Sequence, residues 1–134
     1  MAQVSRAITL KSAAADVWAA IGGFQALPDW HPAIAASVRE DIGGVEHRRL
    51  SLEGGGEILE KSMGGGAMSY GYQILESPLP VADYYATITV TPSAEGASTV
   101  VWSSTFEPTR EGAEDVIGGI YDAGIRALAA RFGH

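Results

Sequence analysis

The sequence predicts an α+β fold in which a seven-stranded antiparallel sheet is covered by a long C-terminal helix. Three observations lead to this prediction. Residues 111–132 carry a helical apolar pattern and form the only segment long enough for a major helix. One segment near the N-terminus and six between residues 35 and 107 alternate apolar and polar residues, as strands do. A sheet of this kind must bury one face, and the long helix is the obvious cover.

The chain begins with a predicted strand and a short helix. Apolar and polar side chains alternate over residues 4–10, which predicts the first strand. We expect a helix over residues 13–21, with Ser12 as its N-cap and with the pair Gly22-Gly23 at its end. The apolar side chains of this helix would point inward.

A second short helical turn and a rigid loop follow. Residues 24–27 predict one more turn, which Pro28 would stop because proline has no amide donor. Residues 28–32, Pro-Asp-Trp-His-Pro, predict a loop held rigid by its two prolines. Trp30 and His31 are neighbours in this loop, and connecting loops often carry function. The segment is therefore a candidate part of a site.

Six further strands are predicted at residues 35–41, 46–52, 56–63, 69–76, 84–91 and 99–107. Short sequences rich in glycine, proline and serine separate them and predict tight turns. Strands joined by such turns become antiparallel neighbours in chain order. The glycine runs at 54–56 and 64–66 lie between strands, whereas a phosphate-binding loop leads into a helix. We therefore interpret both runs as hairpin turns.

The predicted C-terminal helix combines an apolar stripe with three glycines. We expect Thr109 to cap its start and Gly133 to end it. Gly118, Gly119 and Gly124 each cost about 1 kcal/mol of helix stability relative to alanine. We interpret these glycines as making room for a cavity between the helix and a curved sheet. The apolar stripe consists of Val116, Ile117, Ile120, Tyr121, Ile125, Leu128 and Phe132.

Length and composition indicate one globular domain, residues 1–134. Hydrophobic residues make up 46% of the chain and charged residues 19%, as in ordinary globular proteins. The formal net charge of −7 argues against binding to nucleic acid or to anionic membranes. The chain has no apolar run of about 18 residues and no signal-peptide pattern, so we expect a cytoplasmic protein without membrane insertion.

The residue inventory limits the chemistry of a site. Cysteine is absent, which excludes disulfides, thiol nucleophiles and thiolate metal ligands. We find no cluster of His, Asp and Glu at the spacing of metal ligands, so we expect neither a metal nor a cofactor. His31 has the most suggestive setting of the three histidines and is a weak candidate for acid–base chemistry. A structural or pocket-gating role for His31 is the alternative.

Aromatic and charged residues on the predicted strands suggest a pocket. Tyr70 and Tyr72 share one strand face, and Trp102 and Phe106 share another. Core packing and an apolar pocket wall both fit this pattern, and tyrosine hydroxyls would orient a ligand.

Arg49 and Glu60 lie on adjacent predicted strands. The two side chains either pair inside the protein, where they would face a ligand, or pair on the outer surface, and a one-residue change in register reverses the answer.

Several segments, in their order along the chain, resemble a known group of proteins. These segments are Asp16-Val17-Trp18, Phe24, residues 27–32, Gly54-Gly55-Gly56 with Glu60, Tyr70-Gly71-Tyr72, residues 77–81 before Tyr84, and Trp102 with Phe106. The chain resembles the SRPBCC superfamily, which contains the polyketide cyclase/dehydrase and lipid-transport proteins and is related to START domains and birch-pollen-allergen-like proteins. The resemblance extends over essentially the whole chain.

The resemblance implies the helix-grip fold, in which the seven-stranded sheet wraps around the C-terminal helix. Two short helices follow the first strand, and an internal cavity lies between sheet and helix. Members of the superfamily bind hydrophobic ligands such as lipids, sterols, hormones or polyketides. Some cyclise or dehydrate polyketides with a few polar groups in the cavity.

We therefore expect the chain to bind a small hydrophobic ligand, lipid-, polyketide- or aromatic-like, in this cavity. The alternative is a cyclase/dehydratase-type enzyme in which His31 or Glu60 moves protons while Arg49 and tyrosines stabilise an intermediate. A third possibility is a module that binds a protein partner, and we expect a monomer or a homodimer. The candidate ligand-binding residues are Trp30, His31, Arg49, Glu60, Tyr70, Tyr72, Trp102, Phe106 and Tyr121.

Overall fold

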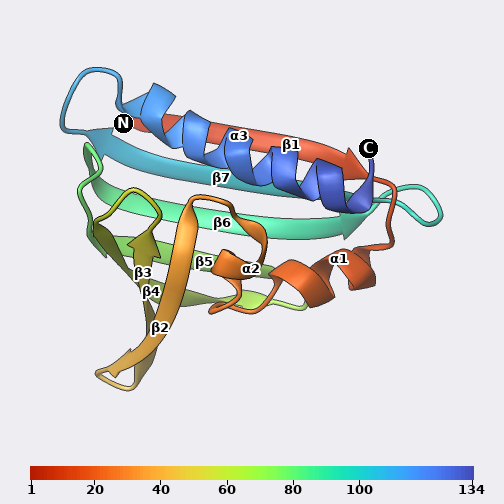
Figure 1. Ribbon diagram of the computed structural model, residues 1–134, viewed down its shortest axis with the longest axis horizontal. Helices are drawn as coiled ribbons and strands as arrows, with labels where there is room; N and C mark the ends of the chain where they lie inside the picture. The colour runs from red at the N-terminus through yellow and green to blue at the C-terminus, as the bar shows by residue number, and fades with distance from the viewer.

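The computed structural model describes residues 1–134 and confirms the predicted α+β architecture. Seven strands and three helices follow one another in the predicted order (Figure 1). The strands are β1 (Ala2–Leu10), β2 (Ile34–Ile42), β3 (Val45–Leu52), β4 (Glu57–Gly66), β5 (Ser69–Glu76), β6 (Val81–Pro92) and β7 (Ser98–Pro108). The helices are α1 (Ala14–Ile21), α2 (Leu27–Trp30) and α3 (Ala113–Phe132).

The strands form one antiparallel sheet in the order β1-β7-β6-β5-β4-β3-β2. Strands β2 to β7 are neighbours in chain order, as the short turns between them predict. The first strand pairs with the last, so that Ile8 lies opposite Val100. Figure 1 shows α3 lying along β1 and β7, and the C-terminus lies beside the end of β1, where the amide of Lys11 donates to the carbonyl of Gly133 at 3.0 Å.

The three helices cover the inner face of the sheet. Helix α1 contacts β6 and β7, while α2 contacts β2 and α3. The buried core therefore lies between the sheet and the helices, and it includes two tryptophans, Trp30 from α2 and Trp102 from β7, whose ring centroids are 5.6 Å apart. None of the helices is both long and apolar enough to cross a membrane.

Two details of the N-terminal helices differ from the prediction. The N-cap of α1 is Ala13, one residue after the predicted Ser12, and it makes no side-chain hydrogen bond. The hydroxyl of Ser12 donates to the carbonyl of Phe132 at 3.3 Å. Pro28 does not stop a helical turn; it lies in the first turn of α2. Proline is tolerated there because the first amides of a helix have no partner within it. Part of the predicted rigid loop is therefore helical.

Strands β4 and β6 are longer than predicted. The run Gly64-Gly65-Gly66 belongs to β4 rather than to a turn, and the register with β5 shifts between Ser62 and Gly65. A side chain at Gly65 would overlap the backbone of Ser69, so this close approach requires glycine. Strand β6 begins at Val81, before the predicted residue 84. Its register with β7 shifts between Ala82 and Tyr85, next to Asp83, whose φ of 50° is positive.

Helix α3 begins two residues later than predicted. Its N-cap is Gly112, with a φ of 85°, so Thr109 lies three residues too early to be the cap. The amide of Thr109 donates to the carbonyl of Pro80. The end is as predicted, since Gly133 caps the helix with a φ of 77° and donates to the carbonyl of Ala129. Most of the predicted stripe faces the sheet, but Val116 is 40% exposed.

The glycines of α3 do not open a cavity, contrary to the prediction. A methyl group at Gly124 would lie 2.9 Å from His31 Cδ2 and 2.9 Å from Trp102 Cζ3, so this glycine permits tight packing of rings against the helix. Gly118 makes room for the guanidinium of Arg6, and Gly119 faces open space. Any chamber beside α3 is therefore formed by other residues.

Candidate ligand-binding site

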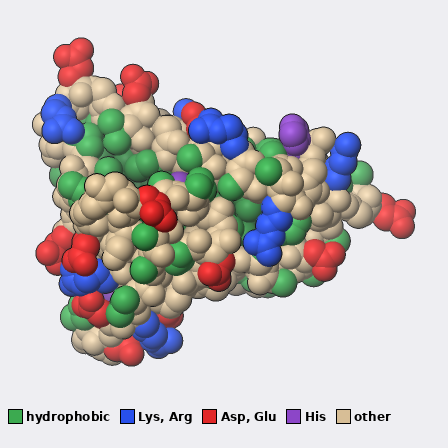
Figure 2. Space-filling view, in the orientation of Figure 1, with side chains coloured by type: hydrophobic (Ala, Val, Ile, Leu, Met, Phe, Trp, Pro, Cys, Tyr) green, Lys and Arg blue, Asp and Glu red, His purple; other side chains and the backbone are tan.

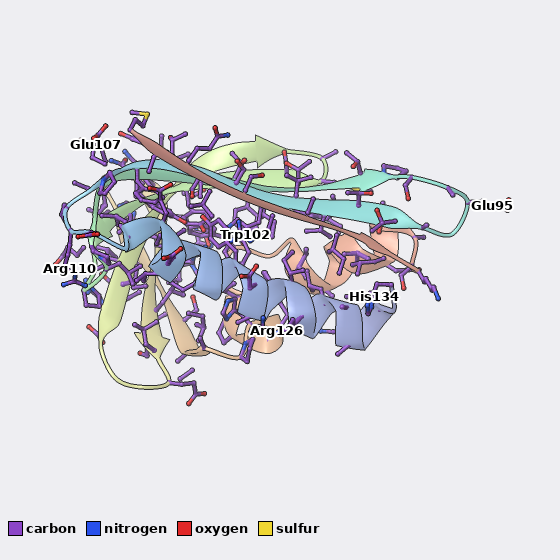
Figure 3. All side chains as sticks on the ribbon, turned by 90° about the horizontal axis from the view of Figure 1, so that it is seen from above. Glu95, Trp102, Glu107, Arg110, Arg126 and His134 are labelled. Carbon is purple, nitrogen blue, oxygen red and sulfur yellow. The ribbon has the colours of Figure 1, made fainter.

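A small chamber lies between the inner face of the sheet and the first half of α3. Its volume is about 30 Å³, which is enough for about two water molecules. Trp102, labelled in Figure 3, projects from the sheet into the space beneath α3 and forms part of the wall. Twelve of the fourteen lining residues are hydrophobic: Leu27, Ile34, Leu50, Ile58, Tyr72, Ile74, Leu79, Tyr84, Trp102, Ile117, Ile120 and Tyr121, together with His31 and Glu60.

An open apolar mouth of about 270 Å³ adjoins this chamber. Chamber and mouth share four lining residues, Ile34, Ile58, Leu79 and Ile120, so these side chains separate the two spaces. The outer rim is formed by Ala33 and by the β3–β4 turn, residues 52–55. On the face shown in Figure 2, hydrophobic side chains gather alongside α3. The mouth is therefore open to solvent, and the four shared side chains lie between it and the chamber.

Three tyrosines that line the chamber have their hydroxyls close together. Tyr72 comes from β5, Tyr84 from β6 and Tyr121 from α3, and we call these three side chains the hydroxyl cluster. The hydroxyls of Tyr84 and Tyr121 are hydrogen-bonded to each other, and those of Tyr72 and Tyr84 are 3.5 Å apart. The indole Nε1 of Trp102 donates to the Tyr72 hydroxyl at 2.9 Å.

The cluster stays protonated at neutral pH. Burial raises the pKa of the Tyr72 and Tyr84 hydroxyls well above the usual value, and burial raises the pKa of Tyr121 to about 12. The ring of Tyr121 also stacks on Trp102, with centroids 4.2 Å apart and planes 19° apart. The cluster is therefore a set of neutral donors held by rigid aromatic packing.

A buried ion pair lies beside the cluster. Arg48 Nε donates to Glu60 Oε1 at 2.7 Å, and the side chain of Arg48 has no exposed surface. Arg48 also donates to the carbonyl of Phe24 at 2.7 Å, and its guanidinium lies over the Phe24 ring, 4.2 Å from the centroid. Burial raises the pKa of Glu60, and the positive charge of Arg48 opposes this shift.

The predicted partner of Glu60, Arg49, is the wrong arginine. In the sheet register Arg48 lies directly opposite Glu60, whereas Arg49 lies opposite Leu59 and faces the other side. Arg49 pairs on the outer face with Glu40, with Nε and Oε2 2.5 Å apart, and lies 3.7 Å from Glu57. The side chain that reaches the interior is therefore one residue earlier in the chain.

His31 is buried, and both of its ring nitrogens are engaged. Nδ1 accepts a hydrogen bond from the amide of Ala33 at 3.1 Å, so the proton is on Nε2, which donates to the carbonyl of Ile120 at 2.7 Å. Burial lowers the pKa of His31, which keeps the ring neutral. The histidine thereby joins the start of β2 to α3 at the mouth, and this role agrees with the structural alternative rather than with acid–base chemistry.

The structure brings together five of the nine predicted site residues. His31, Glu60, Tyr72, Trp102 and Tyr121 line the chamber. The other four do not: Trp30 and Phe106 pack in the core, Tyr70 is buried beside Trp18 and Phe24, and Arg49 is on the outer face.

Sequence reasoning missed two polar residues of this region. Arg48 lies two residues before Leu50 and four before Leu52 in β3, so the three side chains point to the same face of the sheet. This alternation is the signal that Arg48 faces inward. Tyr84 stands two residues before Ala86 and four before Ile88 on the buried face of β6, so its position in the pattern also pointed inward. The apolar mouth residues had no distinguishing signal, because core and mouth positions look alike in a sequence.

Comparison with known proteins gives the chain a family and close structural relatives. The family described as "Polyketide cyclase / dehydrase and lipid transport" matches residues 1–133. The protein XoxI from Bacillus cereus is 36% identical, with a TM-score of 0.91 over 98% of this chain and 96% of that one. An uncharacterized protein from Bacillus thuringiensis is 35% identical, with a TM-score of 0.90 over 98% of both chains.

More distant structures share the fold alone. The Zhui aromatase/cyclase from a Streptomyces species is 15% identical, with a TM-score of 0.68 over 96% of this chain and 87% of that one. Among curated proteins, none matches the chain.

Proposed function

The chain belongs to the polyketide cyclase/dehydrase and lipid transport family, and from this premise we propose that it binds a small hydrophobic molecule between the sheet and α3. The observation that carries the proposal is the contact between the mouth and the chamber, which share Ile34, Ile58, Leu79 and Ile120. Burial of apolar ligand surface there contributes about 25 cal/mol per Å².

The volumes support a compact ligand. The chamber, at about 30 Å³, takes only a small terminal group, while the mouth, at about 270 Å³, is close to the lower limit of about 300 Å³ for small-molecule pockets. A ligand would therefore place its body in the mouth and one end in the chamber. Any ligand that spans both spaces needs the shared side chains to move apart, and a long lipid needs a larger movement than a compact molecule does.

A fluorescence titration with the neutral apolar probe N-phenyl-1-naphthylamine tests the proposal. The substitution Ile120→Arg places a charged side chain between mouth and chamber, and we expect it to weaken probe binding at least about tenfold, the equivalent of about 1.4 kcal/mol. Val116→Arg is the matched control, one turn earlier on α3 at an exposed position, and should leave binding unchanged. Equal binding by both variants would place the probe elsewhere and overturn the proposal.

A second candidate function is acid–base catalysis in the same chamber. The observation in its favour is that a carboxylate, Glu60, lines the chamber together with the hydroxyls of Tyr72 and Tyr121. A base beside hydroxyl donors is suited to removing a proton next to a carbonyl and to stabilising the enolate that forms. The enzyme would then act on a small ketone-containing molecule.

Deuterium exchange distinguishes catalysis from binding. Cyclohexanone in D₂O is followed by NMR for loss of its α-protons, with and without the protein. Catalysis predicts exchange above the buffer rate that Glu60→Gln abolishes in a variant whose circular dichroism shows it to be folded. An unchanged exchange rate with the wild-type protein would favour binding alone.

A further inference from the structure

We propose that His31 is a latch between mouth and chamber: the neutral ring holds the start of β2 against α3, and protonation of the ring releases it and admits ligands. The partition between the two spaces consists of Ile34, Ile58, Leu79 and Ile120. This inference rests on the proposed function, because a ligand that spans both spaces must part these side chains. It goes further by naming the group that controls their movement.

The first argument is the position of His31 between two sides of the partition. On one side, its Nε2 donates to the carbonyl of Ile120 on α3 at 2.7 Å. On the other side, its Nδ1 accepts from the amide of Ala33 at 3.1 Å, and its own carbonyl accepts from the amide of Ile34 at 3.2 Å. His31 therefore ties Ile34 to Ile120, which are two of the four residues that separate the spaces.

The second argument is that no other hydrogen bond makes this connection. The bond from His31 to Ile120 is the only one between α3 and residues 14–66, the part of the chain from α1 to β4. The pair of Arg6 and Asp122 holds the helix to β1 instead, and a tyrosine of the hydroxyl cluster joins it to β6. Loss of the His31 bond thus frees the mouth side of α3 while the helix stays anchored on the sheet.

The third argument is that the rim of the mouth is attached to the same segment. The carbonyl of Ala33 accepts from the amide of Glu53, in the β3–β4 turn, at 3.0 Å. Both residues line the mouth, together with Gly54 and Gly55 of the turn. When the bond from His31 to α3 breaks, the start of β2 and the turn therefore move together, and the mouth widens toward the chamber.

Protonation of His31 removes the hydrogen-bond pattern on which the latch depends. Nδ1 is an acceptor in the neutral ring, but both nitrogens carry protons in the imidazolium. The new proton on Nδ1 would face the amide proton of Ala33, so the hydrogen bond becomes a contact between two donors. The imidazolium can still donate to Ile120, so the release is driven by the lost acceptor together with the burial of the new charge.

The surroundings of the ring do not compensate that charge. The rings of Trp30 and Trp102 flank His31, with centroids 5.9 Å and 5.8 Å away. Burial lowers the pKa of His31, and the bond to Ile120 opposes this shift as the smaller effect. Neutral His31 is therefore stable only while the ring stays enclosed.

The charged and titratable groups on the elements around the ring are already paired, neutral or exposed. Glu60 of β4 is bound to Arg48, and the hydroxyl cluster of β5, β6 and α3 is neutral. On α3, Asp122 is bound to Arg6. The remaining groups are exposed and comprise Asp29 of α2, Glu53 of the β3–β4 turn and Arg126 of α3. None of these groups offsets the effect of burial on the pKa of His31.

The test measures how fast N-phenyl-1-naphthylamine binds, by stopped-flow fluorescence at about pH 7.5 and about pH 5.5, where the probe stays neutral. His31 in the open form has the ordinary histidine pKa of about 6.5, so the open share rises by up to about tenfold between these pH values. We expect the association rate of the wild-type protein to rise about three- to tenfold. The dissociation rate should rise with it, because a latch controls passage in both directions.

Two histidine variants identify the group responsible. His31→Gln has an amide group that donates to Ile120 and accepts from Ala33 but does not titrate, so its association rate should be independent of pH. His47→Gln is the matched control, because His47 of β3 lines neither the mouth nor the chamber, and it should keep the wild-type rise. α-Tetralone, a smaller neutral ketone followed by the indole NMR signal of Trp102, serves as a second probe.

Amide hydrogen exchange of the wild-type protein tests the latch without a probe or a variant. Relative to the intrinsic exchange rate at each pH, the protection of the Ala33 amide should fall about three- to tenfold from about pH 7.5 to about pH 5.5. The Glu53 amide is the internal control. Its bond to Ala33 moves with the rim, so its protection should not change.

Each outcome of these experiments has a definite meaning. A wild-type association rate that does not change with pH overturns the latch and leaves the proposed function standing, and so does an equal rise in His31→Gln. Failure of both probes to bind overturns the proposed function for compact ligands. The exchange data then decide the latch alone, as they do if His31→Gln proves unfolded by circular dichroism: unchanged protection of Ala33 overturns it, and a loss confined to Ala33 supports it.

Discussion

Arg48 and Glu60 form an ion pair, with Nε and Oε1 2.7 Å apart, at a place where the arginine has no contact with solvent. The pair joins two adjacent strands, and the rings of Phe24 and Tyr72 lie 4.2 Å and 4.8 Å from the guanidinium carbon. Arg48 Nη2 has no hydrogen-bond partner. Glu60 lines the chamber, and it is the only carboxylate that compensates the buried positive charge of Arg48.

Replacing Glu60 by glutamine should destabilise the protein by about 3–5 kcal/mol, because it leaves the buried charge of Arg48 uncompensated. The free energy of unfolding, measured by urea titration, gives the loss directly.

The control is the neighbouring arginine. Arg49→Gln removes an ion pair with Glu40 on the outer face, where solvent screens the interaction, and the loss of stability should be much smaller. If both variants lose a similar amount of unfolding free energy, solvent screens the buried ion pair as well, which would contradict its burial in the structure.

His31 should make the stability of the protein depend on pH. Burial lowers its pKa below the ordinary value of 6.5, so below that pH the unfolded chain binds a proton more readily than the folded one. Neutral His31 therefore makes its full contribution to the free energy of unfolding above pH 6.5. This contribution is lost as the pH falls toward the lower pKa that His31 has in the folded state. Urea titrations between about pH 7.5 and about pH 5.5 should show the decline.

A histidine substitution identifies the group responsible. His31→Gln keeps a donor toward Ile120 but cannot titrate, so its stability should change less over this pH range. His134→Gln alters the exposed last residue and should keep the wild-type decline. If His31→Gln retains the full slope, another group causes the pH dependence.

Two glycines of α3 should respond in opposite ways to alanine. At Gly124 a methyl group would lie 2.9 Å from rings of His31 and Trp102, and overpacking of this kind costs about 1–3 kcal/mol. Gly119 faces open space, so alanine there should stabilise the helix by up to about 1 kcal/mol. Thermal unfolding of both variants provides the comparison, and stabilisation by Gly124→Ala would contradict the tight packing of the two rings on α3.

Most of the fold could be predicted from the sequence, because alternation and turn residues are local signals. The six consecutive strands and the end of α3 at Gly133 followed from such signals. The prediction of a turn at Gly64-Gly65-Gly66 was wrong because glycine occurs where two strands approach closely as well as in turns. Ser12 is not the N-cap because α1 begins at Ala14, one residue later than predicted, which makes Ala13 the cap.

The candidate site was less predictable because it depends on register and on packing between distant segments. A one-residue difference separates Arg48, which faces the interior, from Arg49, which does not. The glycines of α3 predict room for a cavity beside the helix, but a sequence does not distinguish room for a ligand from room for the rings of His31 and Trp102. The hydroxyl cluster joins residues from β5, β6 and α3, and only the tertiary structure places them together.

Intermolecular NOEs between bound α-tetralone and the methyl groups of the protein test the central claim most directly. The account predicts contacts from the probe to Ile34, Ile58 and Ile120, which separate mouth and chamber. A competing location is a groove of about 370 Å³ lined by Met63 and Thr87, whose methyl groups report on it. Contacts to Met63 and Thr87 in place of the three isoleucines would contradict a binding site between the sheet and α3.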